Sequence, residues 1–221
     1  MRYILALMMT VVLALPARAE VEITEVVSPG GITAWLVQEP SIPFTAMELR
    51  FRGGASLDAP GKRGATNLMT GLLEEGAGDL DARGFARALE GLAASFGYDV
   101  GDDSLAVSAR FLTENRDQAV DLLRASLLEP TFAPDAVERV RQQVLTGLAS
   151  DDKDPDELAS REFDKLAYGD HPYGTSFRGT AESVSALTRD DLDRPGMEGA
   201  KFVCSPPLRG PETQTALWHH M

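Results

Sequence analysis

Hydrophobic and polar residues alternate in three segments near the start of the chain, as they do in half-buried β-strands. The segments are VEITEVV (21–27), ITAWLVQ (32–38) and FTAMELRF (44–51), with turn residues between them. This pattern predicts an antiparallel meander. A fourth alternating segment, 104–112, is also expected to be a strand. Four of its hydrophobic residues would share one face: Leu105, Val107, Ala109 and Phe111.

Hydrophobic residues spaced three or four apart predict helices elsewhere. One helix is expected over 64–78 (GATNLMTGLLEEGAG) and a second over 82–95, with Asp81 as its N-cap. Three more are expected over 114–128, 134–150 and 155–168. The order βββαα(β)βααα indicates an α+β fold, with helices packed on one face of an antiparallel or mixed sheet.

The two ends of the chain differ from this folded part, which is expected to span 20–192. Residues 1–19 combine a positive start, an apolar run and an Ala-Arg-Ala cleavage signal, which is typical of a secretory signal peptide. The alternative is an uncleaved anchor helix. Residues 193–221 contain four prolines and no period, so an irregular tail is expected, which a frameshift or truncated reading frame near Asp193 would explain. A cleaved chain would be periplasmic or secreted.

The charge of the chain narrows the choice of partners. Its 21 basic and 34 acidic side chains give a formal net charge of −13. Signal cleavage would remove Arg2 and Arg18 but no acidic residue, and the net charge would become −15. Such a charge disfavours nucleic acid and anionic lipid surfaces. No later segment is apolar enough to cross a membrane.

Few residues offer metal-binding or nucleophilic chemistry. The histidines are His171, His219 and His220, and the single cysteine, Cys204, rules out an internal disulfide. A zinc site needs three or four converging ligands, and two adjacent histidines point in different directions. His171 lies in the turn YGDHPYG, where a loop role is favoured over a catalytic one. Glu74 and Glu75 would diverge by about 100° on a helix, so they are interpreted as surface carboxylates.

A set of motifs resembles the N-terminal domain of the pitrilysin/insulinase-type zinc metallopeptidases, which include the mitochondrial processing peptidases and their periplasmic bacterial relatives. The motifs are RGGASLDAPGKRGATNLMTGLLEEGAG, LAASFGYDVGDDSLAVSARFL, FAPDAVERVRQQVLTGL, DPDELASREFDKLAYGDHPYG and GTAESVSALTRDDL. The resemblance runs from about Val21 to Leu192. It implies that the helix within 64–78 corresponds to the helix that carries the zinc motif H-x-x-E-H in active members.

In that motif two histidines grip zinc from one helix face, and the glutamate acts as a base on the zinc-bound water. Alignment by the flanking GAT and LLEEGAG places the histidine positions on Asn67 and Gly71 and the glutamate position on Thr70. The remaining ligand of the family is a glutamate on a later helix. Here ERVRQQVLTGL places Thr146 and Gly147 where paired glutamates stand. The resemblance therefore implies no catalytic residue and no zinc on this chain.

Members of this family often work in pairs, one subunit bearing zinc and the other helping to enclose the peptide. The chain resembles the zinc-less partner, or its N-terminal half, which would form a heterodimer with a zinc-bearing subunit around peptide substrates. Its substrate-binding residues are not identified by the sequence. Two alternatives stay open: a stand-alone acidic peptide-binding domain or inert fragment, and an active zinc metalloendopeptidase with an unorthodox site.

Overall fold

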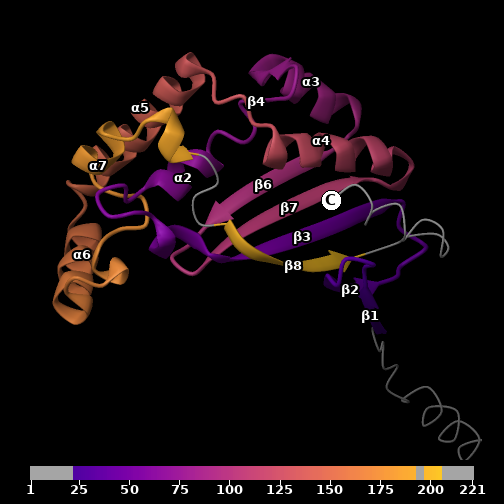
Figure 1. Cartoon of the computed structure of the whole chain (residues 1–221), viewed down its shortest axis with the longest axis horizontal. Coiled ribbons are helices and arrows are strands. Elements are labelled where there is room, and N and C mark those ends of the chain that lie inside the picture. The colour runs from indigo at the N-terminus through magenta and orange to yellow at the C-terminus, as the bar shows by residue number, and fades with distance from the viewer. Residues whose placement is uncertain (1–21, 193–196, 206–221) are drawn as a thin grey trace, which may run out of the picture.

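The computed structural model describes residues 22–192 and 197–205, and Figure 1 shows a curved sheet with helices above it. The six strands of this sheet lie in the order β1-β2-β8-β3-β7-β6. Their bounds are β1 Ile23–Val27, β2 Thr33–Val37, β3 Phe44–Gly53, β6 Ser95–Val100, β7 Ser104–Leu112 and β8 Met197–Ser205. Strands β2 and β8 are parallel, and the other neighbouring pairs are antiparallel. The mixed sheet confirms the predicted α+β class.

Strand β8 lies between β2 and β3, which corrects two expectations. Strands β1 and β2 form the predicted hairpin, but β2 does not pair with β3, so the predicted meander is wrong at that step. The segment 197–205 was expected to be part of an irregular tail, and it forms a strand instead. The segment includes the stretch KFVCS, which contains residues that favour β-strands. A single strand can form from such a stretch without a repeating hydrophobic pattern in the residues around it. Residues 193–196 and 206–221 lie outside the described part.

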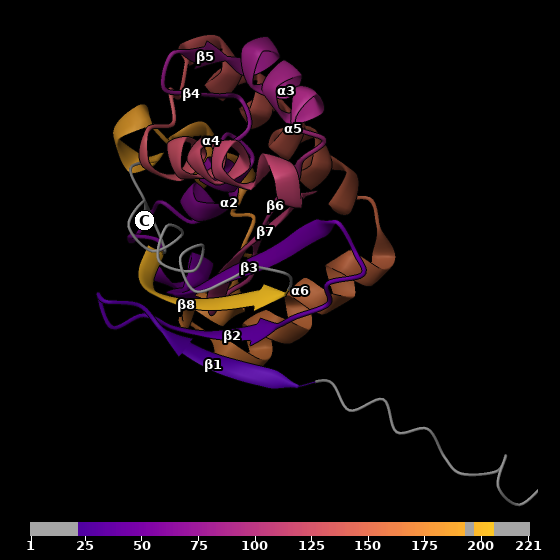
Figure 2. The same cartoon turned by 90° about the vertical axis from the view of Figure 1, so that its right-hand side faces the viewer.

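The helices are α2 Ala65–Thr70, α3 Ala82–Gly91, α4 Arg116–Leu128, α5 Pro134–Asp151, α6 Pro155–Tyr168 and α7 Ala181–Ser185. Short 3-10 turns are η1 Gly54–Leu57, η2 Thr113–Asn115, η3 Pro172–Gly174 and η4 Arg189–Leu192. A small hairpin, β4 Gly76–Ala77 and β5 Leu80–Asp81, precedes α3. In Figure 2, α4 lies between the sheet and α3.

Two helices are shorter than the sequence predicts. Helix α2 ends at Thr70, and the rest of the helix expected over 64–78 is replaced by turns over 71–75, which include Glu74 and Glu75, and by strand β4. Gly71 caps this end, and glycine is a poor helix former. Helix α3 ends at Gly91, because Ala93 adopts a left-handed φ of 48° before β6 begins. Asp81 caps α3 as predicted, accepting a hydrogen bond from the Gly84 amide at 2.7 Å.

The main core forms where the sheet meets α2, α4 and α5. The predicted inward face of β7 is confirmed, since Leu105, Val107, Ala109 and Phe111 are all buried. The helices contribute Leu68 and Met69 from α2, Val120 and Leu123 from α4, and Ala136, Val137 and Val140 from α5. A smaller cluster joins α3 to α4 through Phe85 and Leu122. Burying this apolar surface on one side of the sheet fixes where α2 and α5 meet.

The predicted signal peptide, residues 1–19, lies outside the described residues, as do His219 and His220. Within the described part, none of the helices combines the length and hydropathy that a membrane span requires.

Candidate functional site

Helix α2 carries three of the candidate positions, and Asp58 fixes its start. The carboxylate of Asp58 accepts hydrogen bonds from the Gly64 amide at 2.8 Å and the Thr66 amide at 3.0 Å. It also accepts the Thr66 hydroxyl at 2.6 Å. The chain can turn into the helix here because Gly64 has a φ of 96°, which an L side chain rarely adopts. Two of the backbone amides at the start of the helix are thereby satisfied.

Asn67, Thr70 and Gly71 follow on this helix with no ionisable group among them. Asn67 is half-buried, and Thr70 is buried with its hydroxyl donating to the Asn67 carbonyl at 2.9 Å. Gly71 is exposed and lies beside α5. A Cβ added at Gly71 would come within 2.9 Å of a Val140 methyl carbon, closer than side chains normally approach. Glycine at residue 71 therefore allows α5 to pack closely against the end of α2.

The second pair of candidate positions lies two turns further along α5. The Thr146 hydroxyl donates to the Gln142 carbonyl of its own helix at 2.7 Å. Gly147 is half-buried. The atoms nearest to its missing side chain belong to Arg178 and not to α2. A Cβ at residue 147 would lie 2.1 Å from Nη2 of Arg178, whose Nη1 donates to Asp151 at 2.6 Å. The side-chain space at Gly71 is therefore filled by Val140, and the side-chain space at Gly147 is filled by Arg178.

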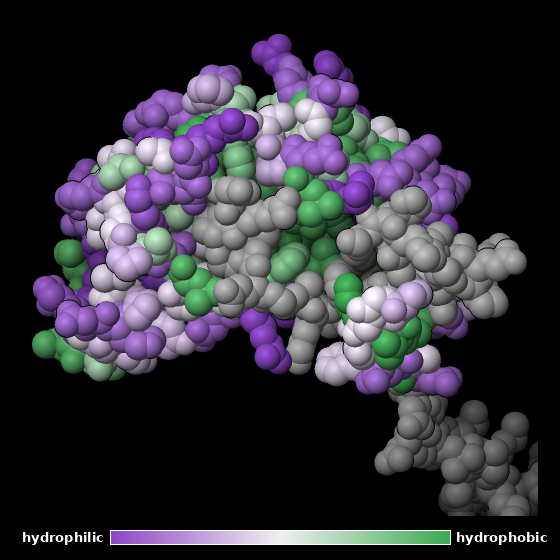
Figure 3. Space-filling model, viewed as in Figure 1, coloured by the Kyte–Doolittle hydropathy of each residue, from purple (hydrophilic) through white to green (hydrophobic). Residues whose placement is uncertain are grey.

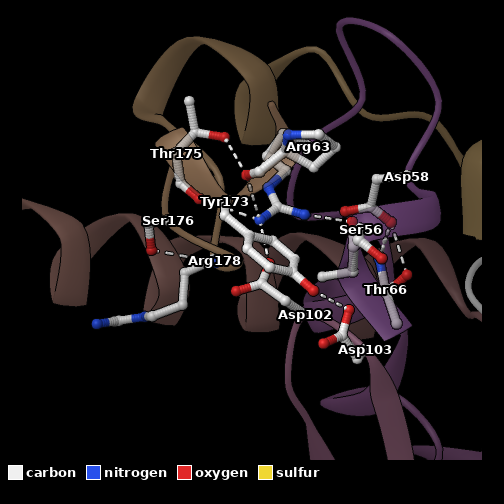
Figure 4. Close-up of polar contacts among 12 residues, drawn as sticks. Ser56, Asp58, Arg63, Thr66, Asp102, Asp103, Tyr173, Thr175, Ser176 and Arg178 are labelled. Atoms are coloured by element: carbon white, nitrogen blue, oxygen red, sulfur yellow. Dashed lines mark hydrogen bonds and ion pairs between the residues drawn. The ribbon is translucent and has the colours of Figure 1, made fainter. Parts of the chain in front are cut away.

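An arginine that sequence reasoning missed ties the surrounding loops together (Figure 4). The guanidinium of Arg63 forms an ion pair with Asp102 in the turn between β6 and β7, and it donates to the Ala55 carbonyl of η1. It also donates to the carbonyls of Pro172 and Thr175, at 2.9 and 3.0 Å. The signal available in the sequence was only a basic residue before the helix, since Asp102, Pro172 and Thr175 are distant along the chain.

Two further contacts surround this network. The Tyr173 hydroxyl donates to Asp103, and this hydrogen bond to the carboxylate raises the pKa of Tyr173. Lys62 donates to Asp191 in η4 at 2.8 Å, and this contact lowers the pKa of the Asp191 carboxyl to about 2. Together with Arg63 they join the start of α2 to segments that follow α6.

The other candidate groups are dispersed. His171 lies in the loop after α6, where its Nδ1 accepts the Tyr173 amide at 3.3 Å, and its ring packs edge-on against that of Tyr173. Glu75 pairs with Arg139 of α5. Burial, followed by the neighbouring charge of Glu75, raises the pKa of Glu74. Neither carboxylate lies beside a histidine in an arrangement for acid–base chemistry. Glu74 is exposed as a whole residue, although its carboxyl group is partly buried.

The residues at the candidate positions do not fit a zinc ion. Asn67, Thr70, Gly71 and Gly147 supply neither imidazole nor carboxylate, the side chains that would hold zinc here. The space in front of both glycines is filled by neighbouring side chains. Across residues 22–192 and 197–205, no three His, Cys, Asp or Glu residues are grouped so that they could hold a metal.

Solved structures identify the class of fold. A crystal structure described as a peptidase M16 inactive domain from Pseudomonas fluorescens matches with a TM-score of 0.82 and 27% identity. The match covers 89% of this chain and 49% of that one. Pitrilysin matches with a TM-score of 0.71 and 16% identity, over 92% of this chain and 23% of that one. The fold is therefore that of a metallopeptidase domain of the pitrilysin type.

The sequence comparisons give the family. Residues 34–181 match insulinase (peptidase family M16), and the chain belongs to this family. The non-peptidase homolog YmxG of Helicobacter pylori is 34% identical over 151 residues, which are 68% of this chain and 35% of that protein. An uncharacterized zinc protease of Mycobacterium leprae is 28% identical over 164 residues, 74% of this chain and 37% of the relative. The chain thus spans little more than a third of the length of these two relatives.

Proposed function

We propose that this chain is a non-catalytic insulinase-family domain that pairs with a zinc-bearing subunit and helps to enclose a peptide substrate. The observation that carries the proposal is the pair of glycines at residues 71 and 147. By the family resemblance, residue 71 is a histidine position and residue 147 is one of the two paired glutamate positions, and the side-chain space at each is filled by another residue. Similarity to a non-peptidase homolog and to an inactive M16 domain supports the same conclusion. On its own, the chain would not hydrolyse peptides.

Strand β6 is the place where we expect the peptide to bind. It forms one edge of the sheet and pairs only with β7 among the described strands. Helix α2 contacts β6, so a peptide added along this edge would pass close to the candidate positions. An extended peptide can join such an edge through main-chain hydrogen bonds. Asp99 is exposed on β6 and Asp103 is exposed in the turn that follows, which favours a basic peptide.

Helix α6 is the surface we assign to the zinc-bearing partner. None of its residues is buried, and Leu158, Phe163 and Leu166 are 44%, 67% and 85% exposed. Figure 3 shows hydrophobic residues at the surface on the side of the molecule where Figure 1 places α6. Exposed apolar patches of this kind commonly mark protein interfaces. Acidic residues flank them along the helix, so a partner surface with apolar and basic residues would fit.

Native mass spectrometry of the protein purified from its own host tests the proposal. We expect a complex with a second subunit that carries H-x-x-E-H and one zinc ion. We expect the complex, and not this chain alone, to cleave peptides with chelator sensitivity. A lone monomer would favour the stand-alone binding domain or inert fragment. Zinc bound to this chain, together with hydrolysis by it, would favour a peptidase with an unorthodox site.

We further propose that the mature protein acts outside the cytoplasm, because residues 1–19 have the form of a secretory signal peptide. N-terminal sequencing of the protein from its host is expected to begin near Glu20. A protein that keeps Met1 and stays in the cytoplasmic fraction would contradict this assignment.

A further inference from the structure

We infer that Arg178 locks the vacated ligand position against metal, so that restoring the ligands alone would not restore a zinc site. Arg178 lies in the loop before α7 and contacts both helices that the family uses to hold zinc, through different parts of the residue. Its guanidinium packs against Gly147 of α5, and its carbonyl oxygen lies 2.6 Å from where a Cβ would stand at Gly64, directly before α2. The side-chain space at residue 147 is therefore occupied by a residue that belongs to neither helix.

Asp151 holds the guanidinium, and Ser176 holds the backbone of the same residue. Its Nη1 donates to Asp151, one helical turn beyond Gly147, at 2.6 Å. The Arg178 amide donates to the Ser176 hydroxyl oxygen at 3.2 Å. About a third of the Arg178 side chain is exposed, and so is about a quarter of the Asp151 side chain. The pair is thus partly screened from water, and moving the guanidinium away from Gly147 would weaken its contact with Asp151.

The charge of Arg178 opposes a metal as much as its volume does. A glutamate introduced at residue 147 would begin its side chain 2.1 Å from Nη2, where it must displace the guanidinium or pair with it. Arginine binds carboxylates through two parallel hydrogen bonds and stays charged at any accessible pH. The new carboxylate would therefore be neutralised by Arg178. A zinc ion nearby would be repelled by the same charge.

Zinc binding by ligand-restored variants tests this role. The starting variant carries Asn67→His, Thr70→Glu, Gly71→His and Gly147→Glu, with Val140→Ala to make room beside residue 71. It is compared with the same variant carrying Arg178→Ala. A control carries Arg161→Ala instead, which removes the nearby arginine that pairs with Asp152 at 2.8 Å. Zinc per chain is measured by elemental analysis after dialysis, with circular dichroism as a check of folding.

The expected result is about one zinc per chain with Arg178→Ala and a small fraction of that in the other two variants. Equal zinc content in folded variants with and without Arg178, whether high or low, would overturn the inference. This readout does not depend on a partner subunit, so it stands apart from the test of the proposed function.

A second measurement keeps the inference testable if the multiple variants do not fold. Gly147→Ala is made in the original chain and in Arg178→Ala, with Gly91→Ala as the control for helix propensity. Gly91 ends α3, and nothing lies within 4 Å of a Cβ there. Gly91→Ala is expected to raise Tm by roughly 2 °C. Gly147→Ala should give a similar rise in Tm only in the Arg178→Ala background. An equal rise in both backgrounds would show that Arg178 does not occupy the side-chain space at residue 147.

Discussion

Replacing Arg63 by alanine is expected to destabilise the domain more than replacing an exposed charged residue by alanine would. The side chain of Arg63 is 13% exposed, and it holds Asp102 together with three carbonyl oxygens, one from η1 and two from the loop that contains η3. Removing it would leave the Asp102 carboxylate without its cation and the carbonyls without this donor. Asp102 is 33% exposed and can regain some water, which limits the loss.

The size of the effect follows from the burial of the pair. Breaking a buried ion pair by removing one partner costs about 3–5 kcal/mol, and the partial exposure of Asp102 brings the expected loss to about 2–4 kcal/mol. Arg50 provides the matched control. It pairs with Glu48 at 2.6 Å, but the two side chains are 57% and 42% exposed. Arg50→Ala should therefore change the free energy of unfolding by about 0–1 kcal/mol.

Urea unfolding followed by circular dichroism measures both losses. Arg63→Lys should lower the free energy of unfolding by an intermediate amount. A lysine ammonium can keep the contact with the Asp102 charge, but it cannot reproduce the several N–H donors by which the guanidinium reaches three segments. Hydrogen exchange should also show faster opening of residues 169–179 in Arg63→Ala, since that loop loses two hydrogen bonds. If Arg63→Ala lowers the free energy of unfolding no more than Arg50→Ala does, the contacts of Arg63 do not stabilise the domain in the way inferred from their geometry.

Three other changes test separate parts of the structure. Gly71→Ala should cost about 1–3 kcal/mol in urea unfolding, because its Cβ would crowd Val140; a gain in stability would show that the helices have room. The lowered pKa of Asp191 means that its contact with Lys62 stabilises the fold above the ordinary carboxyl pKa, and this stability is lost as pH falls from about 4 to about 2. Lys62→Ala should flatten that part of the stability–pH curve, and an unchanged curve would contradict the assignment. Leu166→Glu should abolish association with the zinc-bearing subunit while leaving Tm within about 1 °C, because the side chain is exposed; an intact complex would exclude this face as the interface.

Local patterns were sufficient to predict several elements from the sequence. The strand at 104–112 and the helix at 155–168 have the predicted bounds, because alternation or a Pro–Gly frame defines each within its own segment. The family was also recognised from motifs spread along the chain, and the family match confirms it. That the chain carries no zinc stays a prediction, since it rests on the alignment of Asn67, Gly71 and Gly147.

Features that depend on distant residues were not predictable in this way. Nothing near Arg63 indicates that its partners are Asp102 and the loop after α6. The packing of Arg178 against Gly147 likewise joins a loop to a helix that ends 27 residues earlier, at Asp151. The place of β8 was missed for a similar reason, because its pairing partners are at the opposite end of the chain.

The position of β8 has a consequence for how the domain folds. Among the described strands, β2 joins the part of the sheet beyond β1 only through β8, and the paired residues Ala34 and Phe202 are more than 160 positions apart. During synthesis, the β1–β2 hairpin can therefore join the rest of the sheet only after residues 197–205 have been made. Closing so large a loop is entropically costly, and sheets with such non-local pairing fold slowly. The hairpin edge of β2 would be open to other chains throughout this interval, so prompt capture by β8 protects the nascent domain from aggregation.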